Sequence, residues 1–151
     1  MNKITWPSIR FRFQFRENRI FLGLLLLIFS VYLWLAWQPI ESLLSGFLVD
    51  DAFYYFKVAS NLTKGLGPTF DGEHLTNGYH PLWMGIATAV YYIFPNDKIL
   101  PIQLILTLAI LFFAGTALLS WKIIVRLVSD KATRIVLALA YVLNPWNVSN
   151  A

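Results

Sequence analysis

The feature that most constrains this chain is a run of 21 residues, Ile20–Ile40, without a charged side chain. As an α-helix this run reaches roughly 32 Å, enough to cross a hydrocarbon core of about 30 Å. A secretory signal peptide has a shorter apolar core of about 7–15 residues, which ends in small residues. This run ends instead with Trp34 and Trp37, residues typical of a membrane interface. We therefore expect a retained membrane anchor.

Two further stretches repeat the pattern. Ile99–Trp121 provides 23 uncharged residues, and another apolar stretch begins at Ile135. Charged residues make up 13% of the chain and hydrophobic residues 58%, against about 25% and about 45–50% in soluble domains. Cysteine is absent, which excludes a disulfide framework and thiolate chemistry. The sequence predicts an all-α fold of polytopic transmembrane helices, one membrane module over 1–151 that stops inside its last helix, as a truncated protein would.

The segment Pro81–Asn96 is ambiguous, because its 16 uncharged residues reach only about 24 Å as a helix. If it does not span, 1–19 and 122–134 share one side with nine basic residues, and 41–98 holds three. If it does span, each side holds six. The positive-inside rule favours the first arrangement. We therefore expect a cytoplasmic N-terminus and a cytoplasmic loop at 122–134, with 41–98 as one outer loop.

The expected spans are 20–40, 99–121 and 135–151. Within the outer loop we expect two helices on the membrane surface, at about 51–64 and 81–95. In the first, apolar residues recur at helical spacing; they are Ala52, Phe56, Ala59 and Leu62. The polar residues Lys57, Asn61 and Lys64 lie elsewhere around this helix. Gly65 and Gly67 are expected to stop it.

The adjacent carboxylates Asp50 and Asp51 lie just beyond the first span, on its outer side. Their mutual repulsion and a nearby low-dielectric surface both raise the affinity of one carboxylate for a proton. One of them can therefore act as a general base, or the pair can bind a divalent cation. The competing interpretation is a helix cap on a solvated face. The aromatic residues that follow, and the lone His80, are either substrate contacts or structural residues.

The basic segment 1–19 is interpreted as a topogenic tail beside the anchor. Its stretch Arg10-Phe11-Arg12-Phe13 can also lie on anionic headgroups. We expect no nucleic-acid partner, because the anchor already explains the basic tail. The sequences Asn61-Leu62-Thr63 and Asn147-Val148-Ser149 match the N-glycosylation pattern, which is common by chance and carries no weight here.

The stretch from Asp50 to Trp83, DDAFYYFKVASNLTKGLGPTFDGEHLTNGYHPLW, resembles the first outer loop of GT-C type polytopic glycosyltransferases. Protein O-mannosyltransferases, aminoarabinose transferases and mycobacterial arabinosyltransferases share that architecture. An acidic pair after the first span and a His-Pro at the start of a later apolar helix recur in the group. The resemblance covers about residues 20–145. It implies two helices on the outer membrane surface.

The resemblance also implies an activity, namely transfer of a sugar from a polyprenyl-phosphate donor to an extracytoplasmic hydroxyl, with inversion, at the plasma (inner) membrane. Asp50 or Asp51 would be the catalytic base, and its neighbour would orient it or hold a metal. The implied substrate-binding residues are Tyr54, Tyr55, Asn77, Tyr79 and His80. The chain departs from the family in length, because such enzymes have many more spans. The alternatives are a non-enzymatic membrane protein, such as a transporter part or an assembly factor, and a truncated reading frame without function.

Overall fold

The computed structural model describes residues 15–44, 48 and 50–144, without the side chains of 15–18, 50 and 131. The described residues form six helices and no strand, apart from one isolated bridge between Thr69 and Leu75. The helices are α1 (Phe15–Ala36), α2 (Ile40–Leu44), α3 (Asp50–Thr63), α4 (Pro81–Ile93), α5 (Leu100–Leu127) and α6 (Lys131–Val142). The predicted all-α fold class is confirmed.

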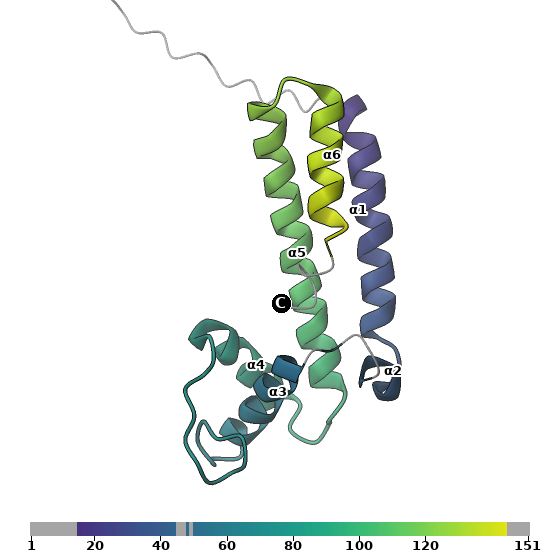
Figure 1. Ribbon diagram of the computed structural model, residues 1–151. Coiled ribbons are helices and arrows are strands. Elements are labelled where there is room, and N and C mark those ends of the chain that lie inside the picture. Colours follow the sequence, from purple (N-terminus) through teal and green to yellow (C-terminus); the bar gives the residue numbers. More distant parts are fainter. Residues whose placement is uncertain (1–14, 45–47, 49, 145–151) are drawn as a thin grey trace, which may run out of the picture.

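Helices α1, α5 and α6 lie side by side as a bundle (Figure 1). Aromatic rings join them: Phe21 of α1 stacks on Trp121 of α5, with ring centroids 4.5 Å apart. Further along α5, Phe113 stacks on Tyr141 of α6, with centroids 5.9 Å apart. Stacked aromatic pairs add stabilisation beyond the apolar area that they bury. These rings therefore fix how α1 and α6 sit on α5.

Within the described residues, two helices are long and apolar enough to cross a membrane, by length and composition. They are α1, from Arg19 to Ala36, and α5 over its full length. Few of their residues are fully buried within the protein: 17% in the stretch Arg19–Ala36 of α1 and 28% in α5. The exposed side chains are largely aliphatic and aromatic, and include Leu26, Leu27, Trp34, Phe112 and Leu119.

The short helices α3 and α4 gather at the end of the bundle where α5 begins (Figure 1). They pack mainly on each other and on the first turns of α5. Their shared core joins residues of all three helices: Phe56, Val58, Ala59, Met84, Ala87, Tyr91, Ile102 and Ile105. Two members of the apolar stripe predicted for α3, Phe56 and Ala59, are buried in this core, and Ala52 and Leu62 pack against it.

Several helix ends differ from the expected spans. The first expected span reached Ile40, but α1 ends at Ala36, because Pro39 disfavours helical geometry in the residue before it. The second was expected to stop at Trp121, but α5 continues to Leu127. Only 128–130 then separate α5 from α6. The end of the third expected span, from residue 145, lies outside the described residues, as does the stretch 10–13.

Candidate functional site

The acidic pair lies inside the first turn of α3. Helix α3 begins at Asp50, so both aspartates belong to its first turn, and capping of the helix by one of their side chains stays a prediction. Acidic residues in a first turn interact favourably with the positive end of the helix dipole. Asp51 is exposed to solvent, while the side chain of Asp50 lies outside the described part of the chain.

Helix α3 ends where the two glycines predicted its end. The N–H of Gly65 donates to the carbonyl of Leu62 at 3.2 Å, and the N–H of Leu66 donates to the carbonyl of Asn61 at 3.1 Å. This pair of bonds is the Schellman motif, which requires a left-handed residue after the helix. Gly65 has a φ of 76°, which glycine adopts without steric cost. The chain therefore turns sharply into a long loop, 64–80.

Asn61 fixes the first part of this loop. Its side chain is 2% exposed. The amide nitrogen donates to the carbonyl of Thr69 at 2.9 Å and to that of Phe70 at 3.2 Å. Asn61 was expected away from the apolar face of α3, but the loop folds over it. A buried amide that already holds two carbonyls is not accessible for glycosylation, and the second match, at Asn147, lies outside the described residues.

Two tyrosines of α3 fix the last part of the loop. The hydroxyl of Tyr54 is hydrogen-bonded to the hydroxyl of Thr76, and its ring stacks on Phe70 with centroids 5.9 Å apart. The hydroxyl of Tyr55 accepts a hydrogen bond from the backbone N–H of His80 at 2.8 Å. The loop therefore runs back along α3, from Asn61 toward its first turns, and delivers the start of α4 beside Tyr55.

This path brings part of the predicted site together. Asp51 lies three and four residues before Tyr54 and Tyr55, so helical spacing places the three side chains on one face of α3. Loop residues 76–80 therefore lie beside the face that carries Asp51. A Cβ at Gly78 would lie 3.6 Å from the Tyr54 hydroxyl, so the loop backbone passes close to that ring.

The remaining predicted site residues differ in their surroundings. Asn77 and His80 are exposed, and the hydrogen bond of His80 to Tyr55 uses its backbone rather than its imidazole. Tyr79 is half-buried and packs against the core that α3 and α4 share. The tyrosine hydroxyls of α3 already hold the loop, so contact of Tyr54 and Tyr55 with a substrate stays a prediction.

Sequence reasoning missed one interacting pair in this loop, Asp71 and His74. The Asp71 carboxylate accepts hydrogen bonds from the backbone N–H of His74 at 2.8 Å and of Glu73 at 2.9 Å. The His74 ring lies 2.7 Å from its second oxygen. These bonds, the His74 N–H foremost, hold the pKa of Asp71 far below its usual range. The sequence signal that could have predicted this turn is Asp71-Gly72, because an Asp-Gly pair favours a turn in which the carboxylate accepts nearby backbone N–H groups.

No group of three or more His, Cys, Asp or Glu side chains that could hold a metal occurs among the described residues. The divalent cation considered for Asp50 and Asp51 stays a prediction.

Over the described residues the fold is all-helical, with two helices that could cross a membrane and a pair of short helices at one end of the bundle. Comparisons with protein-family models, curated proteins and solved structures find no match. The function must therefore be inferred from the residues of this chain.

Proposed function

We propose that this chain is the N-terminal portion of a membrane glycosyltransferase that moves a sugar from a polyprenyl-phosphate donor to an extracytoplasmic hydroxyl. One observation carries the proposal: an acidic pair opens a short helix at one end of an apolar bundle, and a tyrosine-anchored loop lies beside it. A site of this kind would let a lipid-borne sugar meet a carboxylate at a membrane surface.

The exposure of the long helices supports a membrane position. A core helix of a soluble protein is mostly buried, whereas only a minority of the residues of α1 and α5 are buried. Contact of uncovered apolar side chains with lipid is favourable in free energy, whereas their contact with water is unfavourable. An N-terminal helix alone could be a signal sequence, but α5 lies far from the N-terminus. We therefore place both helices across the bilayer.

The charges at the two ends of the molecule support an orientation. The N-terminus of α1, the C-terminal part of α5 and the start of α6 carry Arg19, Lys122, Arg126 and Arg134. Most acidic residues belong to the other end, with α2, α3 and the loops around α4. The positive-inside rule then gives a multi-pass protein of the plasma (inner) membrane whose N-terminus is cytoplasmic. The acidic pair is extracytoplasmic, and α3 and α4 lie on the membrane surface.

In this position Asp50 or Asp51 removes the proton from the acceptor hydroxyl. The hydroxyl oxygen then forms a bond to the anomeric carbon of the sugar, while the bond from that carbon to the lipid phosphate breaks. Attack opposite the leaving phosphate inverts the anomeric configuration. The second aspartate orients the first or holds a divalent cation. Asn77, Tyr79 and His80 contact the donor from the loop that Tyr54 and Tyr55 hold beside the pair.

The proposal is tested with the full-length protein in vesicles that carry a panel of polyprenyl-phosphate sugars. Asp50→Asn and Asp51→Asn should each be expressed, and the variant that lacks the base should lose about 100-fold or more of the transfer rate. Glu73→Gln removes an exposed carboxylate of the loop 64–80 and should leave the transfer rate unchanged. Full transfer by both aspartate variants would refute the base assignment. Transport without any sugar transfer would support a non-enzymatic membrane component instead.

A further inference from the structure

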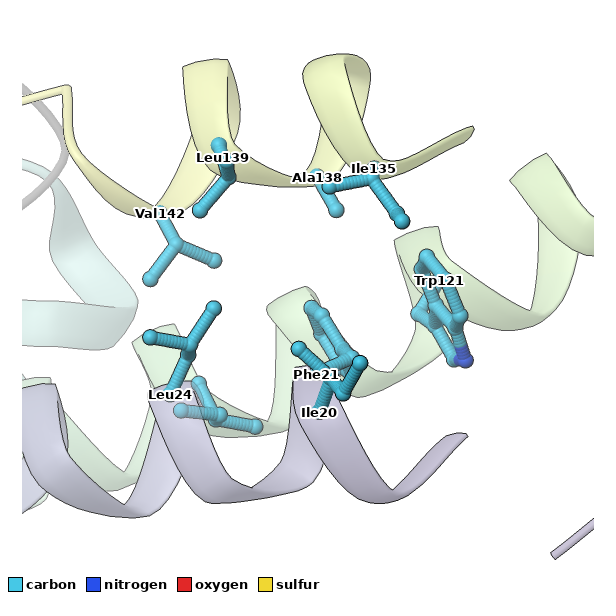
Figure 2. Close-up of a pocket in the computed structure, with 9 residues that line it drawn as sticks. Ile20, Phe21, Leu24, Trp121, Ile135, Ala138, Leu139 and Val142 are labelled. Carbon is cyan, nitrogen blue, oxygen red and sulfur yellow. The ribbon is translucent and has the colours of Figure 1, made fainter. Parts of the chain in front are cut away.

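Helix α4 carries apolar residues that no other described element covers. At the far end of the bundle, side chains of α1, α5 and α6 line a gap whose enclosed part holds only about 20 Å³, the space of one water molecule (Figure 2). On α4, by contrast, Leu82 is 81% exposed, Tyr92 76% and Ile93 66%. Gly85 and Ala89, which lie between them in the chain, are exposed as well. The surroundings of this face must therefore be inferred from the chemistry and position of α4.

Helix α4 has no polar face. Its 13 residues include no charged side chain. The hydroxyl of Thr88 donates to the carbonyl of Met84 at 2.8 Å, so this group is satisfied within the helix. The side of α4 that carries Met84, Ala87 and Tyr91 is buried. An amphipathic helix on a membrane surface presents a charged or polar face to water. A helix that is apolar all round is instead surrounded by protein or by lipid.

The packing partner of α4 differs in this respect. Helix α3 exposes Asp51 and Lys57, so it does present charged side chains to water. Its apolar residues Phe56 and Ala59 are buried in the core that it shares with α4. Helix α3 therefore suits a position on the membrane surface, whereas α4 suits a position below that surface.

A contact between two rings ties α4 to the middle of α5. Trp83, in the first turn of α4, meets Phe112 of α5 with ring centroids 6.3 Å apart. Phe112 lies about 18 Å along α5 from Leu100 and about 15 Å before Lys122. The uncharged part of α5 thus extends in both directions from this contact. Because α5 is proposed to cross the bilayer, the ring of Trp83 lies among acyl chains.

The length and the ends of α4 limit how far the helix enters. Its 13 residues measure about 20 Å, too short to cross a hydrocarbon core of about 30 Å. Exposed polar residues stand on both sides of it, Asn77 and His80 before the helix and 96–98 after it. Both ends therefore reach the headgroups, and only the body of α4 lies below them.

We infer that α4 is sunk in the outer leaflet beside α5, and that its exposed face, with Leu82, Ala89 and Ile93, contacts lipid acyl chains. The ring of Trp83 holds the helix at this depth. The inference rests on the proposed membrane position of α5 and refines the surface position proposed for α4. It does not depend on sugar transfer.

The test attaches a nitroxide spin label to single introduced cysteines of the full chain in lipid vesicles, since the sequence contains no cysteine of its own. Power-saturation EPR then measures how often each label collides with oxygen, which concentrates in hydrocarbon, and with a water-soluble nickel chelate. Labels at Leu82→Cys and Ala89→Cys should collide with oxygen and be protected from the chelate. Both positions are exposed, so the labels should not disturb the packing of α4.

Leu75→Cys is the matched control, because Leu75 is also a leucine and is 78% exposed, but it directly follows the polar turn of Asp71 and His74. Its label should collide with the chelate. Equal accessibility at Leu82 and Leu75 would overturn the inference. Protection of the Ala89 label from both reagents would show that protein covers this face, and would overturn the contact with lipid.

A label on α5 separates failure of the inference from failure of its premise. Leu119 is 61% exposed on α5, and its label at Leu119→Cys should be protected from the chelate. Chelate access at Leu119 would overturn the proposed membrane position of α5, and the inference with it. Protection at Leu119 together with chelate access at Leu82 and Ala89 would overturn the depth of α4 alone.

Discussion

Asn61 ties a 17-residue loop, 64–80, to the helix that precedes it. Its amide reaches the backbone carbonyls of Thr69 and Phe70 in a site that water barely enters. Loss of a buried hydrogen-bond donor destabilises the fold mainly because it leaves the acceptors of that donor without partners. The side chain therefore sets the path of the loop, and with it the place of the residues beside Asp51.

The first prediction concerns this residue. Asn61→Asp keeps the side-chain shape but replaces the donor by a carboxylate that faces two carbonyls. We expect a loss of about 3 kcal/mol or more in the free energy of unfolding, because both a buried charge and unpaired acceptors result. Chemical denaturation in detergent micelles measures the loss. Asn77→Asp, the same change at an exposed position of the loop, is the control and should alter stability little. Equal losses in the two variants would show that the Asn61 amide does not hold the loop.

Sequence could predict some residue roles and not others. Phe56 and Ala59 recur at helical spacing, so their burial on one face of α3 follows from a local pattern. Asn61 has no such local signal, because its partners lie eight and nine residues away and depend on how the loop folds back. The same holds for Tyr55, whose partner His80 lies 25 residues away.

At the scale of elements, apolar windows predicted where helices occur but not where they end. A lysine at the edge of such a window need not interrupt the backbone hydrogen bonds of a helix, and α5 continues through Lys122 to Leu127. Asp130 then caps α6 by accepting from the N–H of Thr133 at 2.7 Å, which starts that helix before the apolar run at Ile135. Charge limits the apolar run, whereas caps and proline limit the helix.

The second prediction concerns the acidic turn of the loop. The folded-state pKa of Asp71 lies below its ordinary value of 3.8, because its carboxylate accepts the N–H groups of His74 and Glu73. A lowered folded pKa contributes stability above the unfolded pKa, and that stability is lost as pH falls through the folded pKa. We expect protection of the loop amides from hydrogen exchange to decline below about pH 4. The residual exchange rates, corrected for the intrinsic effect of pH, measure this decline.

Two substitutions in the loop separate this effect from general acid unfolding. Asp71→Asn cannot titrate, so the decline should be smaller in that variant, and its protection near neutral pH should be lower. Glu73→Gln removes an exposed neighbouring carboxylate and should keep the full decline. An unchanged acid dependence in Asp71→Asn would mean that other groups, such as Asp97 at the start of α5, control the loop.

At the scale of the whole molecule, the arrangement separates two chemical environments along one bundle. Arg19, Lys122 and Arg134 belong to the end where α5 meets α6, and the acidic pair belongs to the first turn of α3. Figure 1 shows that α3 lies at the opposite end, where α5 begins. The charge asymmetry between these ends was readable from the sequence, because charge position along the chain is known without a fold. The closure of α6 against α1 was not, since it depends on contacts such as those of Phe21 and Val142 across more than 100 residues.

The third prediction tests the topology as a whole. The chain contains no cysteine, so a single introduced thiol can be labelled without background. In intact cells, a membrane-impermeant maleimide should label Glu73→Cys in the proposed outer loop. It should label Ser129→Cys, between α5 and α6, only after the membrane is permeabilised.

Phe112→Cys is the control, because its side chain is 57% exposed in the structure but should face lipid and resist labelling in both conditions. Labelling of Ser129→Cys from outside would mean that α4 crosses the membrane and that 41–98 is not one outer loop. Labelling of Phe112→Cys as readily as Glu73→Cys would mean that α5 does not lie in a bilayer.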